Sequence, residues 1–257
     1  MSGAIESVQK PSGEIGLELD LVAAEMISKG RAASRARPSQ SAAVSRPPPP
    51  RTGEHCVPMD LPRWTSMTPV PLRIVGIGVS TGGPSTLERL LPKLPAEFPL
   101  PILLVIHMPA VFIPILASTL NDACRVGVGV AADGETPAPG RVYIGPGDVH
   151  MEIAADLRIR LRQGPPVNGC VPSVDVLFDS MARAAGGRAL GLVMTGMGRD
   201  GAAGLGEMRK RGCVTAAQDE KSSVVYGMPR AALSSGAATY EVPLEEIDRF
   251  LVRAAGR

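Results

Sequence analysis

The sequence predicts an α/β fold, in which a doubly wound and mostly parallel sheet has helices on both faces, as in a three-layer, Rossmann-like arrangement. From Leu72 onward, short apolar runs alternate with segments of helical periodicity. Strands alternating with helices are typical of a parallel sheet covered on both faces, and short, continuous apolar runs are typical of its buried strands. The runs at 151–153 and 157–162 resemble a hairpin, so an antiparallel excursion is expected near residues 141–162.

The expected elements follow one another from residue 72. Strands are expected at 74–79, 102–106, 125–130, 190–195 and 213–217. Helices are expected at 85–91, 111–121, 174–185, 202–211, 229–235 and 244–254. Pro84 suits the first position of the first helix, where its missing N–H costs nothing. A tight, glycine-rich turn therefore joins the first strand to the first helix.

The composition limits the class of protein. With 257 residues the chain can hold one large domain or two small ones, and its net charge of +2 argues against a dedicated nucleic-acid binder. No apolar run reaches the roughly 18 residues of a membrane span and no signal peptide is visible, so a cytoplasmic location is expected. The cysteines lack a C-x-x-C pair and are interpreted as reduced thiols, not as disulfides or a zinc site.

Residues 1–71 differ in composition from the rest and are expected to form a largely disordered tail before a folded domain at 72–257. Residues 16–30 have the pattern of a short amphipathic helix. Residues 29–51 are rich in Ala, Ser, Pro and Arg, and they contain basic but no acidic side chains. Such a segment cannot bury enough apolar area to offset its ordering entropy. It is interpreted as a solvated linker, with a basic tether for an acidic partner or membrane surface as the alternative.

The stretch at 73–84 carries the most specific local pattern. Its residues Gly78-Val-Ser-Thr-Gly82 fit G-x-S-x-G, in which a serine stands exposed on a tight turn between a strand and a helix. Ser80 is therefore a candidate nucleophile. The glycines also resemble the start of a dinucleotide fingerprint, but Thr81 occupies the place of the third glycine, and no P-loop lysine follows. A glycine-rich turn without function is the remaining alternative.

Two more residues of catalytic type stand at strand ends. His107 directly follows the strand at 102–106, and Asp200 lies in the loop after 190–195. Ligands of open α/β sheets bind beyond the carboxyl ends of the strands, so these residues and Ser80 are expected to meet at one edge. Ser80 would attack a carbonyl, His107 would transfer its proton, and Asp200 would orient the imidazole. The order Ser, His, Asp excludes an ordinary α/β-hydrolase.

The surroundings of this triad offer oxyanion donors and leave alternatives open. The backbone amides of Thr81 and Met197 are candidates for binding a developing oxyanion. A histidine at a strand end is often merely structural. Asp148, His150 and Asp200 could instead form a metal site, although the spacing offers no H-x-x-x-H pair. Neither a metal nor a cofactor is expected.

Longer motifs extend over most of the chain. In order they are 78–84 (GVSTGGP), 107–109 (HMP), 139–151 (PGRVYIGPGDVHM), 172–178 (PSVDVLF), 195–202 (TGMGRDGA) and 217–229 (AQDEKSSVVYGMP). With these motifs, residues 72–252 resemble the catalytic domain of the chemotaxis protein-glutamate methylesterase (CheB) family. The resemblance implies that Ser80, His107 and Asp200 are nucleophile, base and acid, and that Thr81 and Met197 line the site.

The same resemblance implies a reaction and a partner. The reaction is hydrolysis of glutamate γ-methyl esters on methyl-accepting chemotaxis receptors, which releases methanol, and some family members also deamidate receptor glutamine. The receptors are thus the expected partners, nucleic acid is not expected, and a monomer is favoured. Two other functions stay open: a catalytically idle adaptor on a signalling complex, and a serine hydrolase acting on another protein ester.

The chain also departs from the family pattern. Ile106 and Thr119 stand where the family often has Gln and Arg. Family members commonly carry an N-terminal receiver domain, which needs about 100 residues or more. Residues 1–71 are too few for it, so an esterase domain without the receiver domain is expected.

Overall fold

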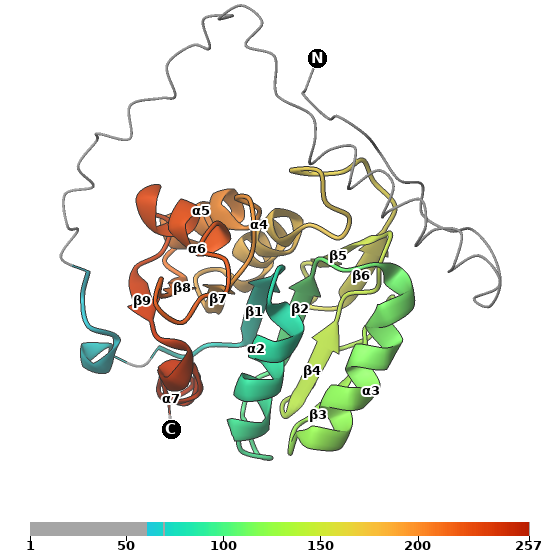
Figure 1. The fold of residues 1–257 in the computed structure, drawn as a ribbon, viewed down its shortest axis with the longest axis horizontal. Coiled ribbons are helices and arrows are strands. Elements are labelled where there is room, and N and C mark those ends of the chain that lie inside the picture. The colour runs from blue at the N-terminus through green and yellow to red at the C-terminus, as the bar shows by residue number, and fades with distance from the viewer. Residues whose placement is uncertain (1–60, 69, 257) are drawn as a thin grey trace, which may run out of the picture. The chain divides into compact units, whose positions relative to one another are not determined.

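A parallel sheet of seven strands forms the centre of the computed structural model, which describes residues 61–68 and 70–256. The strands are β1 (Ile74–Val79), β2 (Ile102–Ile106), β3 (Gly127–Val130), β4 (Arg141–Ile144), β7 (Ala189–Val193), β8 (Val214–Gln218) and β9 (Tyr240–Val242). Their order is β3-β4-β2-β1-β7-β8-β9, and every neighbouring pair is parallel (Figure 1). The predicted fold class is confirmed.

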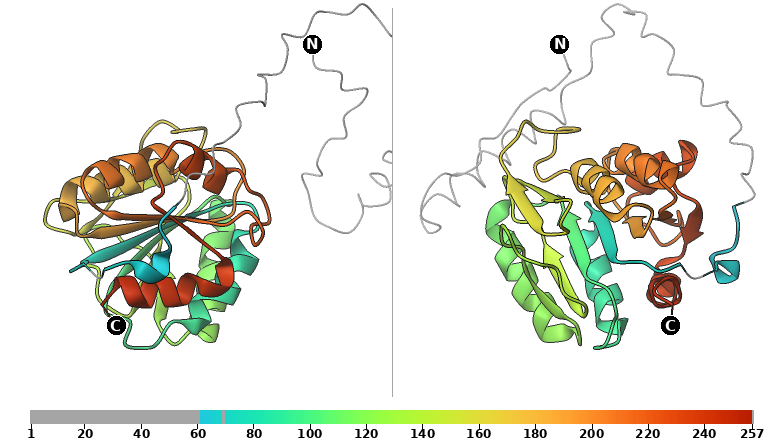
Figure 2. Two further views of the ribbon diagram at one scale, coloured as in Figure 1. Left: turned by 90° about the vertical axis from the view of Figure 1, so that its left-hand side faces the viewer. Right: turned by 180° about the vertical axis from the view of Figure 1, so that it is seen from behind.

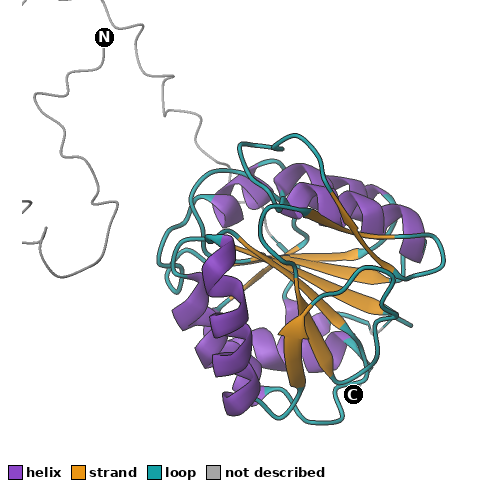
Figure 3. Ribbon diagram, turned by 90° about the vertical axis from the view of Figure 1, so that its right-hand side faces the viewer, coloured by secondary structure: helices purple, strands orange, loops and turns teal. Residues whose placement is uncertain are grey.

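Helices cover both faces of this sheet, which Figure 2 (left) shows nearly edge-on between the two helical layers. One layer holds α2 (Gly83–Leu90), α3 (Ile113–Ala123) and α7 (Leu244–Ala254). The other holds α4 (Val174–Ala185), α5 (Ala202–Lys210) and α6 (Met228–Ser234). Each layer has its own aliphatic core because the central strands bury both of their faces, as their continuous apolar sequences predict (Figure 3).

The central strand β1 has two glycines on the face that α4 covers. A methyl group added at Gly78 would lie 2.2 Å from Cγ1 of Val174, and one added at Gly76 would lie 2.6 Å from the sulfur of Met181. Helix α4 therefore packs closer to β1 than a strand with side chains on this face would allow. This close approach brings the first turn of α4 to the carboxyl end of β1.

The antiparallel excursion is confirmed but shorter than expected. Strands β5 (His150–Ile153) and β6 (Ile159–Arg162) form the predicted hairpin. Strand β4 was expected in the same excursion, but it pairs in parallel with β2 and β3 in the main sheet, where three of its four residues are buried. Strand β9 was not predicted, because it has only three residues and two of them are not buried.

The part of the predicted tail that the structure describes contacts the folded domain. The indole N–H of Trp64, in the short 3-10 helix η1 (Trp64–Ser66), donates to Glu246 at 2.9 Å, and its ring meets that of Phe250 edge-on at 6.1 Å. Met67 is buried in the core beside α7. The expected helix at 16–30 and the expected disorder at 29–51 lie outside the described residues.

Two further 3-10 helices complete the described elements: η2 (Leu91–Lys93) after α2, and η3 (Ala110–Phe112) before α3. The region expected as one helix at 111–121 is thus divided between η3 and α3, which begins with Pro114 in its first turn. Among the helices that the structure describes, none combines the length and apolar composition that a membrane span requires.

Candidate active site

The candidate residues lie where the direction of the chain across the sheet changes. Strands β1 and β7 are neighbours, but the chain leaves β1 through α2 towards β2 and leaves β7 through α5 towards β8. Helices α2 and α5 cover opposite faces, so their first turns diverge at this point. Ligands of open α/β sheets bind at such a switch point. Ser80 follows β1 here, and Asp200 ends the loop after β7.

Ser80 stands on the predicted turn between a strand and a helix. Its backbone N–H donates to the carbonyl of Thr195 at 2.9 Å, and its carbonyl accepts from the N–H of Gly83 at 2.8 Å. Gly82 has a φ of 80°, a left-handed conformation that favours glycine and lets the chain enter α2 at once. Helix α2 begins one residue before Pro84 rather than at it. The sequence pattern G-x-S-x-G therefore has the structural context that its function requires.

His107 lies next to Ser80 on the neighbouring strand end. The last paired residues of β1 and β2 are Val79 and Ile106, and the N–H of His107 continues the ladder by donating to Val79 at 3.1 Å. One step further along this parallel register, Ser80 and His107 stand side by side. Ser80 and His107 therefore follow neighbouring strand ends at one edge of the sheet.

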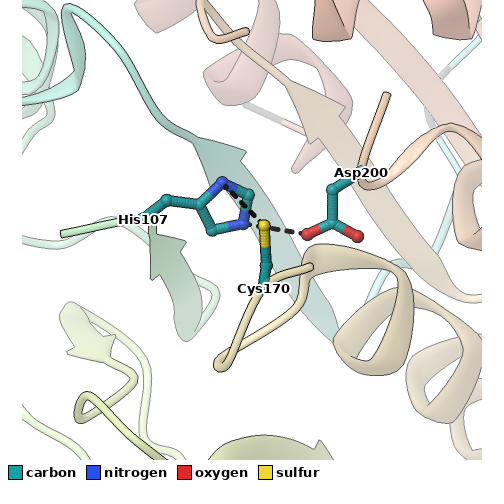
Figure 4. Close-up of side chains that lie close together, drawn as sticks. All are labelled: His107, Cys170 and Asp200. Atoms are coloured by element: carbon teal, nitrogen blue, oxygen red, sulfur yellow. Dashed lines mark hydrogen bonds and ion pairs between the residues drawn. The ribbon is translucent and has the colours of Figure 1, made fainter. Parts of the chain in front are cut away.

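Asp200 is the most constrained of the three residues. One carboxylate oxygen, Oδ2, accepts from His107 Nε2 at 2.9 Å (Figure 4) and from the N–H of Val174 at 2.7 Å. The other, Oδ1, accepts from Ser173 Oγ at 2.7 Å, Asn168 Nδ2 at 3.1 Å and the N–H of Asp175 at 3.2 Å. The first turn of α4 and the loop before it thus supply four of the five donors.

These hydrogen bonds determine the charge of Asp200. Burial alone raises the pKa of this carboxyl group, but donation from His107, Ser173, Val174 and Asn168 outweighs burial and lowers the pKa below its usual value. Asp200 is therefore ionised at neutral pH, and Nε2 of His107 carries the proton that it donates. The lone pair of a neutral His107 is then on Nδ1, which is the nitrogen available as a base.

Acid should remove the contribution of Asp200 to stability. Because its pKa is lower in the folded chain than the value of about 3.9 in an unfolded one, ionised Asp200 stabilises the fold fully above about pH 4 and stops doing so as the pH falls through its folded pKa. We expect the difference in free energy of unfolding between the wild type and Asp200→Asn to shrink below about pH 4. Urea titrations from pH 3 to 7 measure this difference, and a gap that widens towards acid would contradict the assignment.

The free nitrogen of His107 faces a residue that the sequence analysis did not single out. Cys170 Sγ lies 3.7 Å from His107 Nδ1, and because Nδ1 carries no proton, the thiol donates (Figure 4). Among the described residues, no hydrogen bond joins the Ser80 hydroxyl to His107. Burial, followed by the negative charge of Asp200, raises the pKa of the Cys170 thiol, so it is protonated at neutral pH.

The two candidate oxyanion donors flank Ser80. Thr81 follows it directly, and its carbonyl accepts from the Thr195 hydroxyl at 2.9 Å. Met197 follows Gly196, whose Cα is so close to Ser80 that an added methyl group would lie 2.7 Å from the serine Cβ. The N–H groups of Gly227 and Met228 both donate to the carbonyl of Gly196 and fix this turn. Met197 itself projects into solvent, with an exposed fraction of 75%.

His150 has a structural position, which disfavours the metal site considered with Asp148. Its ring is buried, Nε2 lies 3.0 Å from the carbonyl of Pro165, and Nδ1 accepts from the N–H of Ser173 at 3.2 Å. Both nitrogens are therefore engaged, and the imidazole connects β5 to both ends of the loop that carries Cys170. This loop has no periodic pattern, so the sequence offered no signal for Asn168 or Cys170 beyond their polar character, whereas Ser173 lies in the motif at 172–178.

The chain was compared with known proteins. The family model described as CheB methylesterase matches residues 75–251. The protein-glutamate methylesterase/protein-glutamine glutaminase of Chromohalobacter salexigens is 45% identical over 98% of this chain and 69% of that protein, and its namesake from Symbiobacterium thermophilum is 41% identical over 99% and 71%. The crystal structure of the Thermotoga maritima CheB methylesterase catalytic domain matches 72% of this chain and 99% of its own, with 37% identity and a TM-score of 0.69. The chain belongs to the CheB methylesterase family.

Proposed function

We propose that this protein is a protein-glutamate methylesterase that hydrolyses glutamate γ-methyl esters on methyl-accepting chemotaxis receptors, with Ser80, His107 and Asp200 as its catalytic triad. The single observation that carries the proposal is the His107–Asp200 hydrogen bond at the strand end next to Ser80. The names of the relatives support the choice of ester and the additional deamidation of glutamine.

The first half of the reaction forms an acyl-enzyme. Ser80 Oγ attacks the ester carbonyl carbon while His107 Nδ1 takes the hydroxyl proton, and Asp200 stabilises the imidazolium through Nε2–H. The negative oxygen of the tetrahedral intermediate accepts hydrogen bonds from the N–H groups of Thr81 and Met197. The C–O bond to the methoxy group then breaks, and Nδ1–H protonates the departing oxygen, so that methanol leaves.

The second half returns the enzyme to its starting state. Water attacks the acyl carbon, gives its proton to His107 Nδ1, and the bond to Ser80 Oγ breaks as that oxygen regains a proton. The product is a free glutamate side chain. A glutamine side chain passes through the same acyl-enzyme, with ammonia leaving in place of methanol.

One observation favours a second candidate, in which Cys170 is the nucleophile. Its sulfur, not Ser80 Oγ, is hydrogen-bonded to His107 Nδ1. However, the raised pKa of Cys170 disfavours the thiolate, which is the nucleophilic form. Ser80, in contrast, is next to both proposed oxyanion amides. We therefore favour Ser80.

The direct test is methanol release from membranes that contain methylated chemoreceptors. We expect the purified chain to release methanol and the same chain with Ser80→Ala to release none. If neither releases methanol while a small methyl ester is hydrolysed in a Ser80-dependent manner, the hydrolase assignment holds and the receptor substrate is wrong. If neither substrate is hydrolysed, the idle adaptor is the better interpretation.

A further inference from the structure

Three side chains with metal-binding atoms gather at the candidate active site. One ligand atom each from His107, Cys170 and Asp200 lies within 4.8 Å of the other two, and no second group of this kind occurs among the described residues. Figure 4 shows the sulfur against the imidazole ring and the carboxylate beyond its Nε2 edge. Imidazole and thiolate are ligands that Zn²⁺ prefers.

Asp200 is not a free ligand in this group. Its two oxygens already accept five hydrogen bonds, so a metal ion would have to displace donors from the first turn of α4. Its contact with Nε2 has a different consequence. Histidines that bind metals commonly donate their other N–H to a carboxylate, which fixes the tautomer and increases the basicity of the ligating nitrogen. Asp200 prepares His107 Nδ1 in this way.

The separation of the two remaining atoms fits one zinc ion. With a Zn–S bond of about 2.3 Å and a Zn–N bond of about 2.0–2.1 Å, two ligands at a tetrahedral angle are about 3.6 Å apart. Cys170 Sγ and His107 Nδ1 are 3.7 Å apart. The distance between the two atoms therefore suits a shared ion. The His107 side chain is 15% exposed and Cys170 is half-buried, so water can reach the ion and fill the other two coordination positions.

We propose that His107 Nδ1 and Cys170 Sγ form a Zn²⁺ site that reversibly inhibits the hydrolase. On binding, the thiol releases its proton to solvent, Zn–S and Zn–N bonds form, and all but two of the water ligands of the hydrated ion leave. The ion then occupies the lone pair that must accept the Ser80 proton. The inhibition rests on the proposed function, whereas the binding of the ion does not.

Inhibition is tested with the full chain and a small methyl ester. We expect micromolar or lower free Zn²⁺ to inhibit the wild type and a chelator to restore its rate. Cys170→Ser should raise the half-inhibiting Zn²⁺ concentration by at least about tenfold. Removing a residue that only hydrogen-bonds to a metal ligand already lowers metal affinity by about that factor, and Cys170 is itself a proposed ligand. Rates are normalised to the metal-free rate of each variant. Cys124→Ser is the matched control, since Cys124 is also half-buried but belongs to no ligand group, and it should leave inhibition unchanged.

Binding is tested separately from activity. Co²⁺ bound to a thiolate gives a charge-transfer absorption band, and because His55 and Cys56 are adjacent in the sequence, the titration uses the full chain with His55→Ala and Cys56→Ser. We expect one Co²⁺ per chain with this band, displaced by Zn²⁺ and abolished by either Cys170→Ser or Cys170→Ala. If the Co²⁺ band appears but the chain has no esterase activity, the metal site is supported and the proposed function is wrong. No band, or equal inhibition of wild type and Cys170→Ser, would overturn the zinc site.

Discussion

Ser80→Ala should reduce kcat on a methyl ester by about 10⁴–10⁶-fold, because loss of the nucleophile of a triad leaves only substrate binding and oxyanion stabilisation. The fold should persist, since the Ser80 backbone bonds to Thr195 and Gly83 do not involve its hydroxyl group. Single-turnover rates and far-UV circular dichroism, measured on the same preparations, separate loss of chemistry from loss of structure.

The matched control for this experiment is Cys170→Ala. Cys170 Sγ is the atom that is hydrogen-bonded to His107 Nδ1, but only Ser80 precedes Thr81, the proposed oxyanion donor. We expect Cys170→Ala to keep its turnover within about tenfold of the wild type, as a residue outside the mechanism does. The opposite pattern, an active Ser80→Ala and an inactive Cys170→Ala, would move the nucleophile to the cysteine.

Asp200→Asn should be the second most damaging substitution, with kcat reduced by about 10³–10⁴-fold. The amide has nearly the same shape as the carboxylate, but it cannot hold the imidazole as the Nε2–H tautomer and does not stabilise its positive charge. In addition, the amide nitrogen would replace one acceptor oxygen and would face an N–H donor from the first turn of α4. The rate should therefore fall even where the variant is fully folded.

Ser173→Ala provides the graded comparison. It removes one of the five hydrogen bonds to Asp200 and leaves the charge in place. We expect a much smaller loss of kcat than in Asp200→Asn, with both measured well below their unfolding midpoints. If the two variants lose activity equally, Asp200 acts by holding α4 in place, and its role as the acid of the triad is wrong.

The parts of the fold that the sequence predicted share one physical property. Strands β1, β2 and β7 are continuous apolar runs that end in polar residues, so both their existence and their ends can be identified from hydropathy alone. The expected placement of Ser80 and His107 at neighbouring strand ends followed, because parallel strands present their carboxyl ends at one edge.

The parts that were missed depend on partners distant in sequence. Strand β4 is as short as the hairpin strands beside it, and only its neighbours β2 and β3 determine which sheet it joins. Cys170 is in an irregular loop that is positioned by a buried histidine on β5. Local periodicity carries no information about such contacts.

The glycines of β1 also bear on how this chain could change over time. Because Gly78 leaves just enough space for Val174, a larger residue at either position collides with the other. Val174 in turn supplies a backbone donor to Asp200. A larger residue at position 78 is therefore tolerated only with a smaller residue at position 174. These two positions, 96 apart in the chain, should change together in evolution.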